Sequence, residues 1–343
     1  MPEAKMEGGE LALRLLGDME QITWERHGQM ALDNAKRNLA LLDKGQSLAA
    51  LRDVQIGTSD QAVVIAAGPS IRRHDPIARI KKANFQGAVI ATDSAVAYCL
   101  RNGVIPDLVV TLDPHAKRIV RWFGDPDLTE DAIRNDDYYR RQDMDTAFAD
   151  EMRYNREMLA LLDEHGHKMR IAVSTSASEA VVNRVTSTGM KLYWWNPMLD
   201  DPDKPDSASR ILYGMNRLPL VNAGGNVGSA CWMMAHAVLG KSKVALTGMD
   251  FAYYDDTPYS ATQYYREALD LVGEENLHKL FVRIFNPYTN AWFYTDPAYY
   301  WYRTAFLDMV TTADCQTFNC TEGGILFGDG IDFCSLDSFL THE

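Results

Sequence analysis

Six apolar runs, separated by helical patterns, constrain the fold of this chain more than any other feature. The runs are residues 62–66, 88–91, 108–112, 170–173, 191–195 and 244–247. Unbroken apolar runs are typical of strands that are buried on both faces of a parallel sheet. The helical patterns between them include residues 94–101, 144–165 and 227–239. This alternation predicts a doubly wound, mostly parallel Rossmann-like α/β sheet, in which runs 62–66, 88–91, 108–112 and 244–247 are neighbouring strands.

Residues 1–55 precede the first run and have a different pattern. Leu11, Leu15, Met19 and Ile22 recur at helical spacing, and Gly45 ends the pattern. We therefore expect an N-terminal helical extension over residues 1–55, followed by a Rossmann-like domain over residues 56–343. Polar stretches near residues 124–155 and 199–210 predict surface insertions or lids within that domain.

The charge of the chain limits its partners. The 343 residues carry a net charge of −13, which repels nucleic acid and anionic membranes, so neither is an expected partner. An anionic ligand would need local positive groups or a metal ion. No signal peptide or membrane span is evident, and the five cysteines lack metal-type spacing, so we expect a cytoplasmic protein with free thiols.

The first candidate site follows run 62–66, at Gly68, Pro69 and Ser70. A glycine lets the backbone approach a ligand, and the N–H groups at a helix start can bind an anion. An ordinary strand-to-helix turn explains the pattern equally well, and neither a GxGxxG nor a Walker motif is present. We expect Gly68→Val to abolish nucleotide binding with little loss of folding.

Carboxylates follow the next two runs. Asp93 and Ser94 could bind a ribose hydroxyl or a metal, or could cap the helix over 94–101. Asp113 suits Mg²⁺ binding or acid–base chemistry, and His115 lies two residues beyond it. Lys117, Arg118 and Arg121 come next and predict a local positive patch on one helical face.

A second glycine-containing turn precedes the helical pattern over 227–239. Its candidate ligand-binding residues are Asn222, Gly225, Asn226, Gly228 and Ser229. The turn could bind an anion or a base, or it could be a loop in which Asn226 caps the helix. Asp250 adds a carboxylate after run 244–247. We expect Gly68, Ser70, Gly228 and Ser229 to line one cleft.

The stretches VVIAAGPSI, ATDSAVAYCLRNGVIPDLVVTLDP, NVGSACWMMAHAVLGKSKVALTGMDF and FNCTEGG complete the pattern. Their ordered set resembles the motility accessory factor (Maf) family of flagellin glycosylation proteins and the archaeal 6-hydroxymethylpterin diphosphokinases, over residues 55–330. The stretch 228–251 also resembles bacterial sialyltransferases that use a CMP-activated nine-carbon sugar. That resemblance implies nucleotide contacts at Gly68, Pro69 and Ser70 and at Gly228 and Ser229.

Three hypotheses follow from these patterns and from the resemblance, which implies a nucleotide-binding transferase domain over residues 56–343. The first is a glycosyltransferase that uses a CMP-linked nine-carbon sugar, with Asp113 or His115 at the reacting centre and a protein acceptor such as flagellin. The second is pyrophosphoryl transfer from ATP, with Mg²⁺ on Asp93 and Asp113. The third is a noncatalytic nucleotide-binding protein. We favour metal-independent binding because Asp113 lacks the neighbouring acidic residue that a metal cage needs. A homo-oligomer is compatible with each hypothesis.

Overall fold

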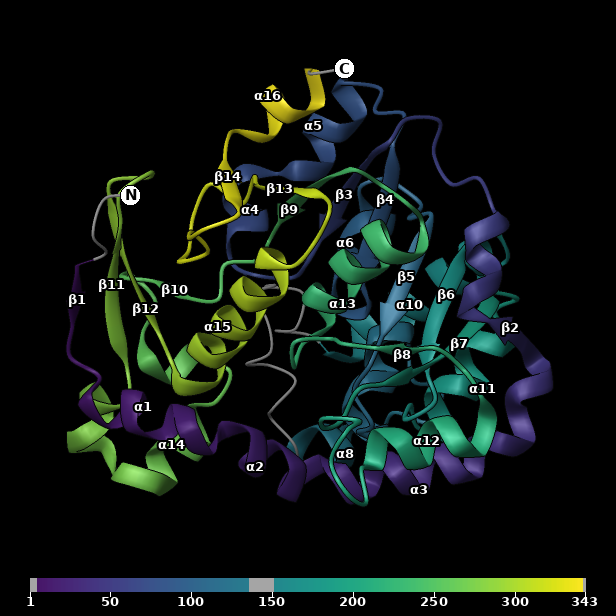
Figure 1. Cartoon of the computed structure of the whole chain (residues 1–343), viewed down its shortest axis with the longest axis horizontal. Helices are drawn as coiled ribbons and strands as arrows, with labels where there is room; N and C mark the ends of the chain where they lie inside the picture. Colours follow the sequence, from purple (N-terminus) through teal and green to yellow (C-terminus); the bar gives the residue numbers. More distant parts are fainter. Residues whose placement is uncertain (1–4, 136–150, 342–343) are drawn as a thin grey trace.

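The computed structural model describes residues 5–135 and 151–341, and a parallel sheet dominates it (Figure 1). Among the described residues, ten strands form this sheet, and every pairing within it is parallel. In sheet order the strands are β14 (Ile331–Phe333), β13 (Gln316–Asn319), β9 (Lys243–Thr247), β3 (Gln61–Ile65), β4 (Ala88–Thr92), β5 (Leu108–Thr111), β6 (Arg170–Ser174), β7 (Lys191–Pro197) and β2 (Gly45–Ser47), with β8 (Leu220–Val221) also paired to β7. The predicted Rossmann-like α/β sheet and the predicted neighbours β9, β3, β4 and β5 are confirmed.

The central strands are apolar on both faces because helices cover both faces. Along β3, Val64 packs in the same cluster as Trp232 of α13, whereas Val63 packs with Ile77 of α5 and Cys99 of α6. All five residues of β3 are buried. Burial of both faces explains why a continuous apolar run, rather than an alternating one, marks each central strand.

The helices agree with the predicted patterns at their centres more than at their ends. The expected helix over 94–101 is α6 with a preceding 3₁₀ turn, and the pattern over 227–239 is α13 continued by a π-helical turn. Residues 144–150 of the third pattern lie outside the described residues. The helices after β3 are α4 (Ser70–His74), α5 (Pro76–Lys82), α6 (Val96–Arg101), α7 (Ala116–Ile119), α8 (Glu130–Asn135), α10 (Glu151–His165), α11 (Glu179–Ser187), α12 (Ala208–Asn216), α13 (Val227–Met233), α14 (Tyr265–Val272), α15 (Pro297–Thr311) and α16 (Leu336–Thr341).

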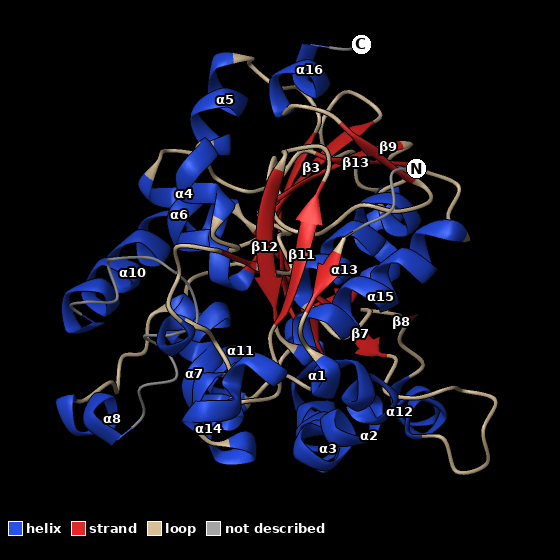
Figure 2. Ribbon diagram, turned by 90° about the vertical axis from the view of Figure 1, so that its left-hand side faces the viewer, coloured by secondary structure: helices blue, strands red, loops and turns tan. Residues whose placement is uncertain are grey.

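A small antiparallel sheet stands beside the large one and was not predicted. Its order is β1 (Met6–Glu7), β11 (Val282–Asn286), β12 (Ala291–Thr295) and β10 (Tyr253–Tyr254), and β11 and β12 run side by side in Figure 2. Aromatic side chains hold it to its surroundings: Tyr253 stacks on Tyr294 and on Tyr299 of α15 at ring-centroid distances of 5.3 Å each. These contacts place α15 between the two sheets (Figure 1).

The N-terminal segment is largely helical but belongs to both sheets. It contains α1 (Glu10–Leu15), α2 (Met19–Thr23), a π-helical turn (Trp24–Gly28) and α3 (Gln29–Asn38). Its strand β1 pairs with β11, and its strand β2 extends the large sheet at β7. The domain boundary at residue 55 stays a prediction.

The two predicted insertions have different outcomes. Residues 136–150 of the stretch 124–155 lie outside the described residues. The stretch 199–210 is a turn that leads into α12, and Asp200 holds it by accepting hydrogen bonds from Ser207 Oγ (2.7 Å) and from the backbone N–H groups of Ala208 and Ser209.

All five cysteines are free thiols. None of the described helices is long and apolar enough to cross a membrane.

Candidate functional site

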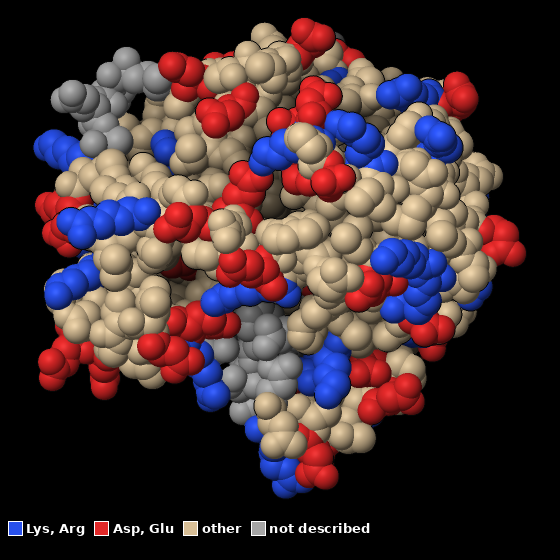
Figure 3. Space-filling view, turned by 60° about the horizontal axis from the view of Figure 1, so that its bottom comes forward, with Lys and Arg blue, Asp and Glu red and all other residues tan. Residues whose placement is uncertain are grey.

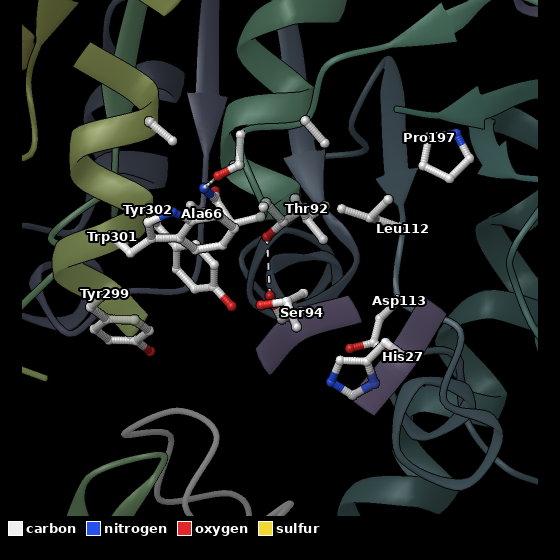
Figure 4. A pocket seen from close by; sticks show the side chains of 18 of the residues that line it. His27, Ala66, Thr92, Ser94, Leu112, Asp113, Pro197, Tyr299, Trp301 and Tyr302 are labelled. Atoms are coloured by element: carbon white, nitrogen blue, oxygen red, sulfur yellow. Dashed lines mark hydrogen bonds between the residues drawn. The ribbon is translucent and has the colours of Figure 1, made fainter. Parts of the chain in front are cut away.

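A cavity of about 880 Å³ lies at the carboxyl ends of β9, β3, β4 and β5 (Figure 4). Two kinds of element enclose it. The strand-end wall consists of the loops after these strands and the turn over residues 222–228. The helical wall consists of α2, the π-helical turn, α14 and α15. Loops at the carboxyl edge of a parallel sheet are where ligands bind in open α/β folds.

The structure brings most of the predicted site residues together in this cavity. Ser70 and Ser229 differ, because both are fully buried behind the wall. Ser70 Oγ donates to Asp250 Oδ2 (2.7 Å), and Ser229 Oγ accepts from Asn226 Nδ2 (2.8 Å). Their hydroxyls therefore position other side chains of the site. The predicted residues that line the cavity are Gly68, Pro69, Asp93, Ser94, Asp113, His115, Asn222, Gly225, Asn226, Gly228 and Asp250.

The Gly68 loop is tightly packed against the neighbouring strand end. Gly68 N donates to Gly248 O (2.9 Å), and Ile71 N donates to Gly68 O (3.2 Å). A Cβ on Gly68 would overlap Gly248 O and Asp250 Oδ2. The expectation that Gly68→Val blocks only the ligand is therefore wrong: Gly68 is required for internal packing, because the space beside its Cα is occupied by protein.

Asp93 lies deep in the strand-end wall. Its carboxylate accepts hydrogen bonds from Ser94 N (2.8 Å) and from Thr111 Oγ1 (2.8 Å). Burial raises the pKa of Asp93 to about 7, against the opposing effect of these two donors. Asp113 raises it further, because a second negative charge is near. A carboxyl that titrates near neutral pH can accept from a ligand hydroxyl or donate to a ligand oxygen.

Asp250 is a second deeply buried carboxyl on the same wall. Burial raises its pKa to about 7 as well, although Ser70 Oγ and Ser70 N donate to Oδ2. Its other oxygen, Oδ1, has no hydrogen-bond partner among the described residues. Of the two carboxylate oxygens of Asp250, the protein therefore fixes Oδ2 by hydrogen bonds and leaves Oδ1 without one.

The turn over residues 222–228 owes its shape to its asparagines and glycines. Asn226 Oδ1 accepts from Ser229 N (2.9 Å), so Asn226 caps α13, as one of the two interpretations expected. Asn222 Oδ1 accepts from Gly224 N (3.0 Å). Gly225 has a φ of +79°, and a Cβ there would lie 2.6 Å from the Trp301 ring. Only glycine combines this backbone with so close an approach of α15.

Asp113 and His115 follow β5 on the opposite side of the cavity from Asp250. The backbone N–H of His115 donates to Asp113 Oδ1 (2.7 Å), which fixes the carboxylate in the loop. Asn34 of α3 also holds this loop, because its Nδ2 donates to Pro114 O (3.0 Å) and Ser176 O (2.8 Å). The N-terminal segment therefore helps to place Asp113.

The positive patch expected after His115 does not form as predicted. Arg121 is buried, with 2% of its surface exposed, and its guanidinium pairs with the equally buried Glu151 (3.5 Å). The side chain of Arg118 is outside the described residues. On the face shown in Figure 3, Lys and Arg side chains alternate with Asp and Glu instead of gathering in one block.

The helical wall contains functional candidates that the sequence patterns missed. The π-helical turn contributes Trp24, Arg26 and His27, and Figure 4 shows His27 and Asp113 in the same part of the cavity. Helix α15 contributes Trp301 and Tyr302, along with Tyr299, and Tyr302 Oη lies 3.4 Å from Tyr264 Oη. The four consecutive aromatic residues over 299–302 are a sequence feature that could have indicated this part of the site.

The charges on the cavity wall are strongly unequal. Among the described lining residues, Arg26 is the only Lys or Arg. The acidic lining residues are Glu20, Asp93, Asp113, Asp200, Asp201, Asp250 and Glu267. Within the described parts of the chain, no group of three or more His, Cys, Asp or Glu side chains is arranged to hold a metal ion.

Residues 31–124 match the family model for 6-hydroxymethylpterin diphosphokinase MptE-like proteins. This stretch runs from α3 through β5 and includes Gly68, Asp93 and Asp113. It confirms the superfamily resemblance that the sequence motifs indicated.

A solved structure extends the likeness to most of the chain. The Maf glycosyltransferase from Magnetospirillum magneticum AMB-1 matches with a TM-score of 0.50 and 17% identity, over 85% of this chain. The match covers 38% of the glycosyltransferase chain. At this identity the likeness shows a shared fold. No curated protein matches the sequence significantly.

Proposed function

We propose that this protein is a transferase that binds a nucleotide-activated donor, specifically a Maf-like glycosyltransferase that uses a CMP-linked nine-carbon sugar. The observation that carries the proposal is the cavity at the carboxyl edge of the sheet. Its volume of about 880 Å³ suits a nucleotide with an attached sugar, since ligand pockets span roughly 300–1,000 Å³. The shared fold with a Maf glycosyltransferase supports the reaction class.

The strand-end wall suits the nucleoside part of the donor. Asp93 lies at the end of β4, and each of its oxygens has one protein donor and a further lone pair for a ribose hydroxyl. The turn over residues 222–228 lies next to it and presents Asn222 and Gly225 to the cavity. Gly68, Pro69 and Asp250 line the same cavity.

The opposite side of the cavity suits the chemistry. In glycosyl transfer the acceptor hydroxyl gives up its proton, its oxygen bonds to the anomeric carbon, and the bond from that carbon to the phosphate oxygen breaks. Asp113 is the proposed proton acceptor because His115 N fixes its carboxylate at the cavity wall. His115 and His27 line the same region. A protein acceptor such as flagellin remains part of the proposal, as does a homo-oligomer.

Diphosphokinase chemistry is the second candidate, because residues 31–124 match the MptE-like family model. It would require Mg²⁺ and ATP, with Asp93 and Asp113 as metal ligands. Asp93 fits this role poorly. It is buried, and its oxygens already accept from Ser94 N and Thr111 Oγ1, which leaves little room for the water ligands that Mg²⁺ keeps.

Isothermal titration calorimetry with CMP and with ATP tests the proposal, each with Mg²⁺ and with EDTA. We expect CMP to bind equally well in both conditions. Asp113→Asn should keep CMP affinity and lose turnover of the CMP-linked sugar, because Asp113 acts in the reaction. Binding of ATP only with Mg²⁺ would support the diphosphokinase. Binding of neither nucleotide would contradict both enzymes.

A further inference from the structure

The charges of the cavity do not match those of the proposed donor. A nucleotide-linked sugar carries a negative phosphate, yet the described lining holds one arginine among several carboxyls. Like charges in a partly buried site repel, so a phosphate needs a cation or oriented N–H donors nearby. The question is which group of this chain supplies them.

The N–H groups of the two predicted anion-binding loops are largely committed to the protein. In the first loop, Gly68 N donates to Gly248 O, Ser70 N to Asp250 Oδ2 and Ile71 N to Gly68 O. In the second turn, the N–H groups of Gly224 and Ser229 donate to asparagine side chains. Asp250 also stands directly behind the first loop. Neither loop is a ready anion cradle.

Arg26 is placed to do what these loops do not. It belongs to the π-helical turn Trp24–Gly28, and its exposed side chain lines the cavity together with Trp24 and His27. A π-helical turn inserts an extra residue into a helix and changes the direction of the side chains around it. Buried Gly28 permits this turn, because a Cβ there would overlap the Trp24 ring.

The helix that carries this turn is fixed firmly to the sheet edge. Asn38 Nδ2, fully buried, donates to Thr175 O (2.8 Å) and to Ala177 O (2.7 Å). Arg37 adds a hydrogen bond to Ala177 O (3.2 Å). Arg26 also acts on the Tyr302 hydroxyl, whose pKa burial raises and the nearby guanidinium lowers. Arg26 and Asp113 both line the cavity, and both act electrostatically on Tyr302.

We infer that Arg26 binds the phosphate of the donor nucleotide, and that the N-terminal segment thereby completes the site. This inference rests on the proposed function. A guanidinium offers paired N–H donors that match phosphate oxygens, so it can hold the phosphate as the bond to the sugar breaks. The ligand class is a nucleoside monophosphate and its sugar ester. Arg26 lies before the MptE-like stretch, so this contact is a feature of the chain outside that match.

Calorimetry with CMP and with cytidine isolates the phosphate contribution. For the unchanged protein we expect CMP to bind more tightly than cytidine. Arg26→Ala should weaken CMP binding about ten- to hundredfold, because it removes a charge-assisted hydrogen bond, and should leave cytidine binding unchanged. Arg26→Lys should restore part of the loss. The matched control is Arg52→Ala, which removes the same charge at an exposed position outside the cavity lining and should leave both affinities unchanged.

The possible failures are distinguishable. If the unchanged protein does not bind CMP, the proposed function fails, whether or not ATP binds with Mg²⁺. If it binds CMP, and Arg26→Ala binds CMP as tightly, the inference is overturned while the proposed function stands. An equal loss of CMP and cytidine affinity would also overturn it, because that result means a structural role. Unchanged circular dichroism of Arg26→Ala confirms that folding is intact.

Discussion

The two walls of the cavity satisfy their polar groups in different ways. In the strand-end wall, Asp93 and Asn226 have partners within the protein, and Gly68 has no space beside its Cα. In the helical wall, Arg26 is exposed, and His27 Nδ1 has no hydrogen-bond partner among the described residues. Polar groups that are committed to the protein stabilise it, whereas an exposed charge such as that of Arg26 can bind a ligand. We therefore expect substitution of Gly68 or Asn226 to affect mainly folding, and substitution of Arg26 or His27 to affect mainly the ligand.

The largest effect should come from Gly68, at the centre of the strand-end wall. Gly68→Ala introduces a Cβ that overlaps Gly248 O and Asp250 Oδ2, so the loop must move. We expect a loss of about 3 kcal/mol in the free energy of unfolding, measured by urea denaturation. Gly214→Ala is the control, because no atom lies within 4 Å of its Cβ position in α12. It should gain about 0.5–1 kcal/mol. Equal stability of the two variants would contradict the packing argument.

A smaller loss is expected where the helical wall is attached to the sheet. Asn38→Ala removes the donor to the carbonyl of Thr175 and leaves the carbonyl of Ala177 with the longer hydrogen bond from Arg37. Unsatisfied buried groups cost about 1–3 kcal/mol, so we expect about 2 kcal/mol in urea denaturation. Gln29→Ala, which removes only an exposed hydrogen bond to Asp33, should change stability by less than about 0.5 kcal/mol. If Gln29→Ala lowers the free energy of unfolding as much as Asn38→Ala does, the Asn38 hydrogen bonds are not what attaches α3 to the sheet.

The pH dependence of stability tests the strand-end wall without changing its packing. The pKa of Asp93 is about 7 in the folded protein, above its ordinary value of 3.8. Between these values the folded state binds more protons than the unfolded chain, so the free energy of unfolding falls as the pH rises from about 4 to 7. Above pH 7 this contribution is constant. Asp250 acts in the same direction.

Asp93→Asn should therefore flatten the fall in stability between pH 4 and 7, measured from urea midpoints at one-unit intervals. Asp131→Asn, at an exposed position in α8, should leave the slope unchanged. A slope that persists unchanged in Asp93→Asn would show that the carboxyl is already ionised across this range.

The strand-end wall could be predicted from sequence and the helical wall could not, for a physical reason. Each buried parallel strand can be recognised from its own apolar run. The parallel topology then brings Asp93, Asp113 and Asp250 to the carboxyl edge of the sheet. What each side chain contacts there is not local. Ser70 turns toward Asp250, a partner 180 positions away, instead of toward the cavity.

The helical wall depends entirely on such distant contacts. The segment that contains Trp24, Arg26 and His27 is held by Asn34 and Asn38 of α3, which donate to loops far along the chain, and by the pairing of β1 with β11. The π-helical turn that directs them has no local sequence signature comparable to a strand. In the antiparallel sheet that supports α15, β1 and β10 are two residues long each and give no sequence signal, whereas β11 alternates between more and less buried residues and could have been recognised.

The smallest effect on stability should come from His27, in the helical wall, where the effect on chemistry should be large. Its ring is half-buried and its Nδ1 has no protein partner among the described residues, so His27→Ala removes little that holds the fold. We expect the free energy of unfolding to change by less than about 0.5 kcal/mol.

Turnover of the CMP-linked sugar should fall, because the ring shares its part of the cavity with Asp113 (Figure 4). If the imidazole moves a proton, kcat falls while CMP affinity is kept, and the pH profile of kcat changes shape. His167→Ala, at an exposed position outside the cavity lining, should change neither quantity. Stability lost at His27 with turnover retained would reverse the assignment of the two walls, because the helical wall would then serve the fold and not the ligand.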